Sequence, residues 1–502
     1  IMDYEILSLI PALLTIAIAL LTHRVALALF AGVLGGAIVL AGYQPLLFLR
    51  GSFEYMLIAF GDIERLKIVL FVILIGGMLE IIAGSGAYTK FAGVMARRLS
   101  TPRRSRVGTW ALSMCLFFDD YANVLISGAT MRNINIRNRV SPAQLAYIID
   151  VVATIASVVI ISTWASFEGS VMAEAGKDAG IHKSFTTFFL ESLPYHFYTF
   201  LAIIMAFVVA YTGKWFGYRA DNATYHLREP TDVNNPRARP IHLLAPIIAL
   251  IGSALIALFL SGFYILKNTG EPVSLIKIIG AAPSLEILIL ATLLATGLGI
   301  MMLRRDKAMS PALMKRHFLK GIKGMTGVSL VIILAKGLSA VSADLGTGNY
   351  LTGAVSSFLS PKFIPFMIFS VSMVITMATG FSWSSMAIVM PIAFQMVHAA
   401  NIPDIIPILS GAVISGAVSG EHIIPFSEKA VMSAAACKIT PVYHIKTQIL
   451  QSISVFLAAA GSYMIIGVNG SLALAFFIPL SVLLSLHFFF ARKNAHAAFV
   501  WI

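Results

Sequence analysis

Long apolar segments alternate with short polar segments along most of this chain. A membrane-spanning helix needs about 20 mainly apolar residues, and about eleven segments meet that requirement. They lie near residues 5–22, 25–42, 67–84, 143–164, 185–212, 241–262, 284–303, 325–343, 404–434, 447–467 and 472–491. Two further apolar stretches, 107–131 and 364–396, are interrupted by polar residues. The pattern predicts an all-α polytopic membrane protein with about 11 transmembrane helices and two re-entrant hairpins.

Charges in the connecting loops predict the direction of each span. The loops 90–106, 213–240 and 304–323 are strongly basic, which is typical of cytoplasmic loops. Alternate loops are balanced or acidic and are expected outside. This assignment places the N-terminus outside and the C-terminus inside. Since 107–131 has a basic flank on both sides, we expect it to enter from the cytoplasm, turn near 119–123 and return.

Two parts of the chain carry their segments in the same order. Apolar runs that end in Gly-x-Gly-x-Tyr, at 84–88 and 346–350, each precede an interrupted stretch and then a helix rich in small residues. The loop charges give the two parts opposite orientations. Inverted repeats with broken helices are typical of secondary transporters. We therefore predict these units: N-terminal helices 1–66, repeat one 67–212, a cytoplasmic loop and connecting helices 213–324, repeat two 325–467, and a C-terminal helix and tail 468–502.

The first interrupted stretch carries two adjacent carboxylates in an apolar setting. A carboxylate inside a membrane is costly and usually faces an ion, a partner or water. Asp119, Asp120 and Asn123 supply the oxygens that Na⁺ prefers, so we predict a Na⁺ site there. Neighbouring carboxylates also resist double ionisation, which lets a proton compete. In the alternative interpretation, one aspartate caps a half-helix and the other meets water.

Further polar residues occupy matching positions in the two repeats. Asp150 and Thr154 share a helix face, although serine and threonine also pack helices together in membranes. The second interrupted stretch has polar residues and a glycine that permits an unusual backbone: Gly380, Ser382, Trp383 and Ser384. After it, a predicted break at Pro425 gathers Glu421, His422, Ser427, Glu428 and Lys429.

Two of these last residues have more than one interpretation. Histidine titrates near neutral pH, so His422 is either a proton carrier or a hydrogen-bonding partner of a carboxylate. Lys429 is either neutralised by its neighbour Glu428 or acts as a built-in cation in the site. Glu80 and Lys336 lie in matching helices, where an ion pair between the repeats is as consistent with the sequence as a role in transport.

Composition excludes several other classes of protein. The chain is 58% hydrophobic and only 12% charged, and its net charge of +13 comes from short loops, so we expect no nucleic-acid partner. Its two cysteines indicate neither a disulfide scaffold nor a zinc site. No nucleophile–base pair or ATP-binding loop is present. We therefore expect no enzyme activity and no cofactor beyond Na⁺ and H⁺ as coupling ions.

The motifs FFDDYAN…GATMR at 117–132, LAYIID…STW…FE at 145–168, TGFSWSSMAIVMP at 379–391 and SGAVSGEHIIPFSEKAVMS at 415–433 resemble the NhaC family of sodium/proton antiporters. The resemblance implies an inverted-repeat carrier that exchanges cations for protons, although some relatives couple cations to carboxylates or amino acids. In the family the last motif usually reads Gly-Asp-His-x-x-Pro-x-Ser-Asp-Thr-Thr. Here Glu421 and Glu428 replace aspartates, and Lys429 and Ala430 stand where threonines would be.

The sequence thus predicts a Na⁺/H⁺ antiporter that works by alternating access in the cytoplasmic membrane of a prokaryote. The alternative is a proton- or sodium-coupled carrier of an amino acid or a carboxylate. Its expected partners are the lipid bilayer and a small cation or organic solute. The segments outside the repeats, 1–42 and 241–303, would also allow a homodimer.

Overall fold

A computed structural model of the chain describes residues 4–493 except 23, 62, 97, 216–234, 270–272, 274–277, 280, 348–349, 351–360 and 426. Most of the predicted cytoplasmic loop 213–240 and the tail 494–502 therefore lie outside the described residues. Every regular element in the described part is a helix. Six helices are long and apolar enough to cross a membrane, or up to nine if three bent pairs each count as one span. The all-α membrane fold is confirmed, whereas the count of eleven spans is not.

The first half of the chain contains the N-terminal helices and the first broken elements. Its helices are α1 (Ile10–Thr22), α2 (Val25–Leu40), α3 (Pro45–Gly61), α4 (Ile63–Gly84), α5 (Ala87–Ala96), α6 (Pro102–Cys115), α7 (Asp120–Arg137), α8 (Pro142–Val152), α9 (Thr163–Asp178), α10 (Phe185–Ser192) and α11 (Phe197–Thr212). Short 3-10 turns extend α8 through Ala153–Val158 and join α10 to α11 at Leu193–Tyr195.

The second half repeats this order after a pair of long helices. Its helices are α12 (Ile241–Thr269), α14 (Ser284–Arg305), α15 (Pro311–Gly324), α16 (Thr326–Asp344), α18 (Ile364–Thr379), α19 (Ser382–Ala400), α20 (Ile406–Glu421), α21 (Glu428–Cys437), α22 (Pro441–Asn469) and α23 (Leu472–Lys493).

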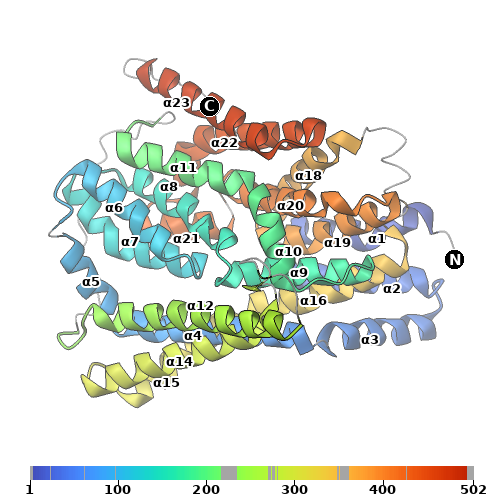
Figure 1. Cartoon of the computed structure of the whole chain (residues 1–502), viewed down its shortest axis with the longest axis horizontal. Helices are drawn as coiled ribbons and strands as arrows, with labels where there is room; N and C mark the ends of the chain where they lie inside the picture. The colour runs from blue at the N-terminus through green and yellow to red at the C-terminus, as the bar shows by residue number, and fades with distance from the viewer. Residues whose placement is uncertain are drawn as a thin grey trace.

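Two helical hairpins approach the middle of the molecule from opposite ends. In Figure 1, α6 and α7 lie in the left half, whereas α18 and α19 lie in the right half. Residues 116–119 join the first pair, a few residues before the predicted turn. Gly380 joins the second pair with a φ of +78°, a conformation that favours glycine. Both interrupted stretches are therefore hairpins of two half-helices, as predicted.

Two further spans are broken at the same depth. The helix that starts at α8 ends after Val158 and resumes as α9 with a bend of 48°. The span α20–α21 is interrupted between Glu421 and Glu428, where Pro425 cannot continue a helix. Figure 1 shows α8 and α21 in the left half and α9 and α20 in the right half, so these spans run in opposite directions. All four breaks come together in the interior.

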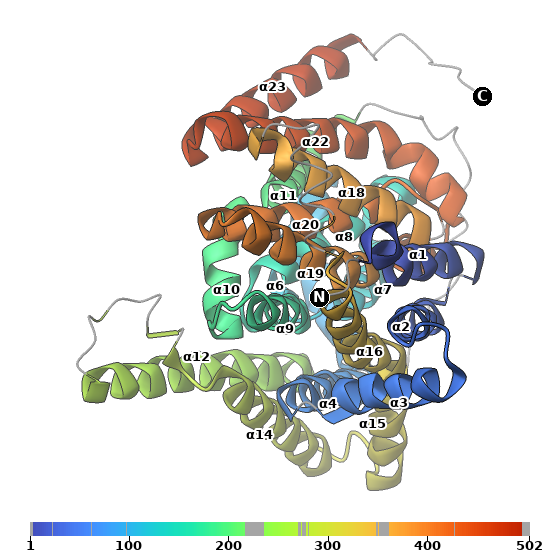
Figure 2. The ribbon, with the colours of Figure 1, turned by 90° about the vertical axis from the view of Figure 1, so that its right-hand side faces the viewer.

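Helices outside this centre form a separate layer. Figure 2 shows α4, α12, α14 and α15 below the rest of the molecule, with α3 beside them. The helices α3 and α15 correct the sequence interpretation. Residues 304–323 were expected to form a loop, and α3 was missed because Arg50 and Glu54 interrupt its apolar pattern; these two side chains form an exposed pair 2.9 Å apart. The amphipathic α15 carries too many charges to be recognised by hydropathy.

Described residues of the basic segments lie at one end of the molecule. Arg106 donates to the carbonyl of Ala210 at the end of α11 (3.0 Å), and Arg239 lies 3.5 Å from Asp306 at the end of α14. Asn235 joins the carbonyls of Ser85 and Ala308 at this end. In Figure 1 the corresponding ends of α11, α12 and α14 lie on the left.

Candidate functional site

Backbone hydrogen bonds attach each hairpin to the broken helix of the same half. The amide of Thr163, at the start of α9, donates to the carbonyl of Phe118 at 3.0 Å. In the second half, the amide of Glu428, at the start of α21, donates to the carbonyl of Gly380 at 3.3 Å. Because both contacts involve main-chain atoms, they form irrespective of the side chains at these positions. The two halves therefore share one backbone arrangement around the centre.

Equivalent serines cap the two resumed helices. Ser162 accepts from the amide of Ala165 and donates to the carbonyl six residues before it, that of Ala156 (2.6 Å). Ser427 accepts from the amide of Ala430 and donates to the carbonyl of Glu421 (2.8 Å), again six residues earlier. Each serine thus satisfies a free amide after the break and a free carbonyl before it. Ser427 was predicted as a site residue, and here it holds the broken helix.

A polar side chain fixes the tip of each hairpin. It lies five residues after the carbonyl of Phe118 in the first hairpin and of Gly380 in the second. Asn123 donates from its amide nitrogen to the carbonyl of Ser113 (2.7 Å) and accepts from Ser127 (3.3 Å). Ser385 donates to the carbonyl of Ser372 (2.7 Å) in the second hairpin. Asn123, predicted as a Na⁺ ligand, thus has its amide engaged within the hairpin.

The two aspartates of the first hairpin lie directly beside the first break. Asp119 and Asp120 are both buried, at 2% and 3% exposure. Asp119 accepts from the hydroxyl of Thr163 at 3.0 Å. Asp120 is the first residue of α7, where the helix dipole favours a negative charge, and its Oδ1 has no hydrogen-bond partner among the described residues. Of the two aspartates, Asp120 thus has an oxygen with acceptor capacity left for a cation or a proton.

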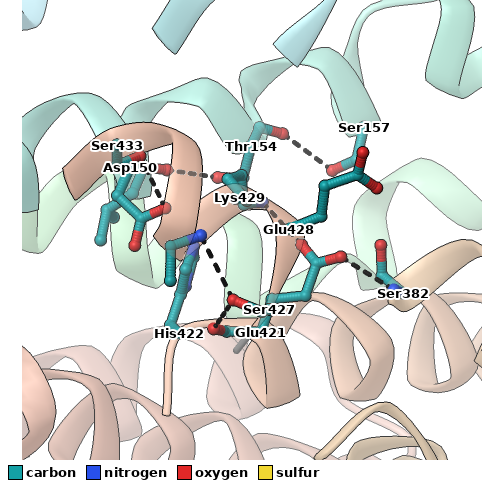
Figure 3. A network of polar contacts seen from close by, with 12 residues as sticks. Asp150, Thr154, Ser157, Ser382, Glu421, His422, Ser427, Glu428, Lys429 and Ser433 are labelled. Atoms are coloured by element: carbon teal, nitrogen blue, oxygen red, sulfur yellow. Dashed lines mark hydrogen bonds and ion pairs between the residues drawn. The ribbon is translucent and has the colours of Figure 1, made fainter. Parts of the chain in front are cut away.

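A buried ion pair lies across the second break (Figure 3). Lys429 Nζ lies 3.0 Å from Glu421 Oε2, and both side chains are almost fully buried. The other oxygen of Glu421 accepts from the amide of Ser382, the first residue of α19, at 2.8 Å. Lys429 therefore pairs with Glu421 and not with its neighbour Glu428. Glu428 is exposed and accepts from the hydroxyl of Tyr121 at 2.9 Å.

Lys429 also faces the first half of the molecule. Its ammonium lies 5.2 Å from the centroid of the Trp164 ring, within the range of a cation–π contact. It interacts electrostatically with Asp120 and Asp150 as well as with Glu421. Trp164, Phe167 and Trp383 form an aromatic wall. The ring of Trp383 stacks on Phe167 at 4.3 Å and meets Trp164 edge-on at 5.9 Å.

Asp150 belongs to a second polar cluster, which joins the two halves. It accepts hydrogen bonds from Ser433 (3.1 Å) and Gln448 (3.0 Å) and lies 3.2 Å from His444 Nε2. Gln448 also donates to the carbonyl of His422. The sequence interpretation missed Ser433, His444 and Gln448. The spacing of His444 and Gln448, four residues apart on one helix face, was the available signal.

The remaining predicted residues lie around these two clusters. His422 Nδ1 is 2.8 Å from the hydroxyl of Tyr198, so its neighbour is a tyrosine and not a carboxylate. Thr154 donates to the carbonyl of Val151, within its own helix. Ser384 donates to the carbonyl of Phe381 and supports the tip of the second hairpin. Ser382 has a buried hydroxyl that makes no hydrogen bond in the described structure.

The other two charges singled out in matching helices do not pair with each other. Glu80 lies 2.5 Å from Lys320 and 3.2 Å from His317, both on α15. Lys336 on α16 pairs with Glu174 on α9. An ion pair between the repeats therefore exists, but Glu174 is the partner of Lys336.

Carboxylates outnumber the ammonium at the centre. Asp119, Asp120 and Glu421 are buried there, and Lys429 is the ion-pair partner of Glu421. Buried charge without a counter-charge is strongly disfavoured, so this group favours uptake of a proton or a small cation. No group of three or more His, Cys, Asp or Glu side chains arranged for a metal ion occurs among the described residues.

Comparisons with known proteins show the family of this chain and its similar sequences. The profile of the Na⁺/H⁺ antiporter family matches residues 155–468. A protein of Haemophilus influenzae without an assigned function is 28% identical over 97% of this chain and 95% of its own length. The malate-2H⁺/Na⁺-lactate antiporter of Bacillus subtilis is 23% identical over 28% of this chain and 30% of its own.

Two solved structures share the fold. MtrF of Neisseria gonorrhoeae, described as one of a class of antimetabolite efflux pumps, covers 86% of this chain and 85% of its own, with a TM-score of 0.55 and 14% identity. The YdaH transporter of Alcanivorax borkumensis covers 91% of this chain and 98% of its own, with a TM-score of 0.58 and 15% identity.

Proposed function

Because this chain belongs to the Na⁺/H⁺ antiporter family and is a membrane transporter, we propose that it exchanges Na⁺ for H⁺ across the cytoplasmic membrane. The observation that carries the proposal is the surplus of buried carboxylates at the meeting point of four broken elements. Asp120, with a free acceptor atom at the start of α7, is the proposed shared site of Na⁺ and H⁺. A group that binds either ion but not both couples their movements.

The proposed mechanism is alternating access between two inverted repeats, 67–212 and 325–467. Backbone hydrogen bonds attach each hairpin to the broken helix of its own half, so each half can move as a unit. The contacts across the halves are side-chain contacts, such as Asp150 with His444 and Lys429 over Trp164. Contacts of this kind can be exchanged without unfolding a helix.

We further propose that the basic end of the molecule faces the cytoplasm, with the N-terminus outside and the C-terminus inside. Single cysteines introduced at Ser471 and Asp306, in a background without Cys115 and Cys437, test this orientation. An impermeant maleimide should label the first in intact cells and the second only after lysis. The reverse pattern would overturn the orientation.

The test of the function uses purified protein in liposomes with a pH-sensitive dye inside. External Na⁺ or Li⁺ should raise the internal pH, because the cation enters as protons leave. Liposomes with the Asp120→Asn protein should not respond, and choline should have no effect on either. Failure of both Na⁺ and Li⁺ to change the pH would overturn Na⁺/H⁺ exchange.

A second candidate function is coupled transport of a small organic acid or amino acid. The observation in its favour is Lys429, an ammonium beside an aromatic wall, which is suited to a carboxylate group. The Bacillus subtilis relative is named for exchange of malate and lactate. A pH response that needs a carboxylic or amino acid and is absent with Na⁺ alone would favour this function.

A further inference from the structure

A cavity lies in the outer layer of helices, and none of its lining residues belongs to the central site. It is bounded by α4, α14 and α15 and has a volume of about 270 Å³. Its floor is apolar, with Ile81, Ile300, Met314 and Phe318, and Pro311 lies at the start of α15. Arg304 and Lys315 complete the lining. The cavity thus combines hydrocarbon-like walls with two cationic side chains.

Close packing of α15 on α4 fixes one side of the cavity. A side chain at Gly77 or Gly84 would meet the rings of Phe318 and His317 within 2.5 Å, and one at Gly321 would meet the carbonyl of Gly76 at 2.2 Å. These glycines let α15 lie against α4 along its later turns. The cavity is lined by residues of the first three turns of α15, the last two turns of α14 and Ile81 of α4. Its shape is therefore set by the backbone.

The nearby acidic side chains are already engaged, which leaves the two cations of the cavity without a counter-charge. Glu80 contacts Lys320 and His317. Asp306 contacts Arg239 and His242. Among the described residues, neither Arg304 nor Lys315 forms an ion pair with an acid, and both are exposed. An anion at this position would therefore meet two cations without competition.

The position of the cavity selects the kind of anion. Arg304 is in the last turn of α14, a helix long and apolar enough to span the membrane, so the two cations lie at the level of the lipid headgroups. The apolar floor extends from them along α14 and α4 towards the membrane interior. We propose that this cavity binds an anionic phospholipid, with its phosphate between Arg304 and Lys315 and an acyl chain on Ile81, Ile300 and Phe318. A soluble anion would leave the apolar floor exposed.

The test compares two double variants with the same change in net charge. Arg304→Gln/Lys315→Gln removes the two cations of the cavity. Arg305→Gln/Arg316→Gln removes two cations that are adjacent in the chain to Arg304 and Lys315 but do not line the cavity. Lipid retention is measured by native mass spectrometry of the full chain, in detergent supplemented with phosphatidylglycerol or phosphatidylcholine. Thermal unfolding in the same samples checks that each variant is folded.

The expected result is selective retention of phosphatidylglycerol by the original chain and by the Arg305/Arg316 variant. The Arg304/Lys315 variant should lose that preference by about tenfold or more, since each cation near a lipid surface contributes about 1 kcal/mol. Equal loss in both variants, or retention in the first, would overturn the proposal. Inorganic phosphate that displaces the lipid and stabilises the protein equally would indicate a simple anion site instead.

Ile300→Trp supplies an independent check, because it fills the apolar floor without changing the charge. It should weaken phosphatidylglycerol retention and leave the effect of inorganic phosphate unchanged. Undiminished lipid retention in this variant would contradict acyl-chain binding in the cavity. The central carboxylates are untouched in all of these variants, so the outcome does not depend on the ion that is transported.

Discussion

The two halves of the molecule share a backbone arrangement, but the charged residues next to their breaks stand on opposite elements. In the first half, the charges are on the hairpin, as Asp119 and Asp120, and the broken helix carries Ala156 and Trp164. In the second half, the hairpin tip carries Phe381 and Ser382, and the broken helix carries Glu421 and Lys429 at the positions of Ala156 and Trp164. The two halves are aligned here on Ser162 and Ser427, because each serine donates to the carbonyl six residues before it.

The difference shows that the breaks and the charges at the centre have separate structural origins. Hydrogen bonds of the backbone and of two serines produce the breaks in both halves. The side chains then place Lys429 of the second half over Trp164 of the first and within electrostatic range of Asp120. A fully symmetric centre would instead hold four aspartates, or two glutamates and two lysines. We propose that this asymmetry selects the charge of the transported solute, and the variants below test it.

The largest effect is expected at Asp120. Asp120→Asn keeps the size of the side chain but removes its charge and its proton, so coupled transport in liposomes should fall to background. Unfolding temperature and monodispersity should match the original chain, because Oδ1 makes no hydrogen bond in the described structure. The exposed Asp404→Asn is the matched control and should transport normally. Full transport by Asp120→Asn would contradict the assigned site.

The next largest effect concerns the ion pair of the second half. Glu421→Gln or Lys429→Gln alone should destabilise the protein by about 3–5 kcal/mol, because each leaves one buried charge without its partner. The double variant should recover most of that loss, since it leaves neither charge. Chemical denaturation of the four proteins in detergent gives the coupling energy. Additive losses would show that the two side chains do not act as a pair.

A smaller, selective effect is expected from Lys429→Thr. Removal of the ammonium frees Glu421 for a cation, so transport should depend more steeply on Na⁺ concentration. Unchanged dependence would mean that Lys429 serves only to neutralise Glu421. Trp164→Phe keeps an aromatic ring opposite Lys429 and should leave the Na⁺ dependence close to that of the original chain.

The smallest effects should be equal in the two halves. Ser162→Ala and Ser427→Ala each remove one helix cap, at a cost of about 1 kcal/mol of stability. Thermal unfolding of the two variants compares them directly. A loss at one serine that is several times larger than at the other would contradict the equivalence of the two breaks.

Much of this architecture could be predicted from the sequence, because a break in a membrane helix is accompanied by polar residues, glycine or proline within an apolar run. Asp119 and Asp120 interrupt one apolar run, Gly380 and Ser382 another, and Pro425 ends a third. The basic flanks of 107–131 indicated a hairpin without any contact information. The helices α3 and α15 could not be recognised by hydropathy, because Arg50 and Glu54 interrupt the apolar pattern of α3 and several basic residues interrupt that of α15.

Partners of the site residues were harder to predict than the residues themselves. Glu428 is next to Lys429 in the chain, yet successive residues on a helix point about 100° apart, and Glu421 reaches Lys429 from across the break. His444 and Gln448 bind Asp150 from a helix almost 300 residues further along the chain. Such pairings depend on how the helices pack, and hydrophobic periodicity does not contain that information.

The main-chain bonds from Thr163 to Phe118 and from Glu428 to Gly380 have a consequence for how the two halves can diverge. An amide and a carbonyl are present whichever residue is encoded, apart from proline at the donor. Apart from Gly380, whose positive φ favours glycine, substitutions can therefore accumulate at these positions while the joint between hairpin and helix persists. Two copies of one segment can therefore acquire different side chains at the centre and keep the same main-chain joint. Their similarity is then retained longer in the backbone geometry than in the sequence.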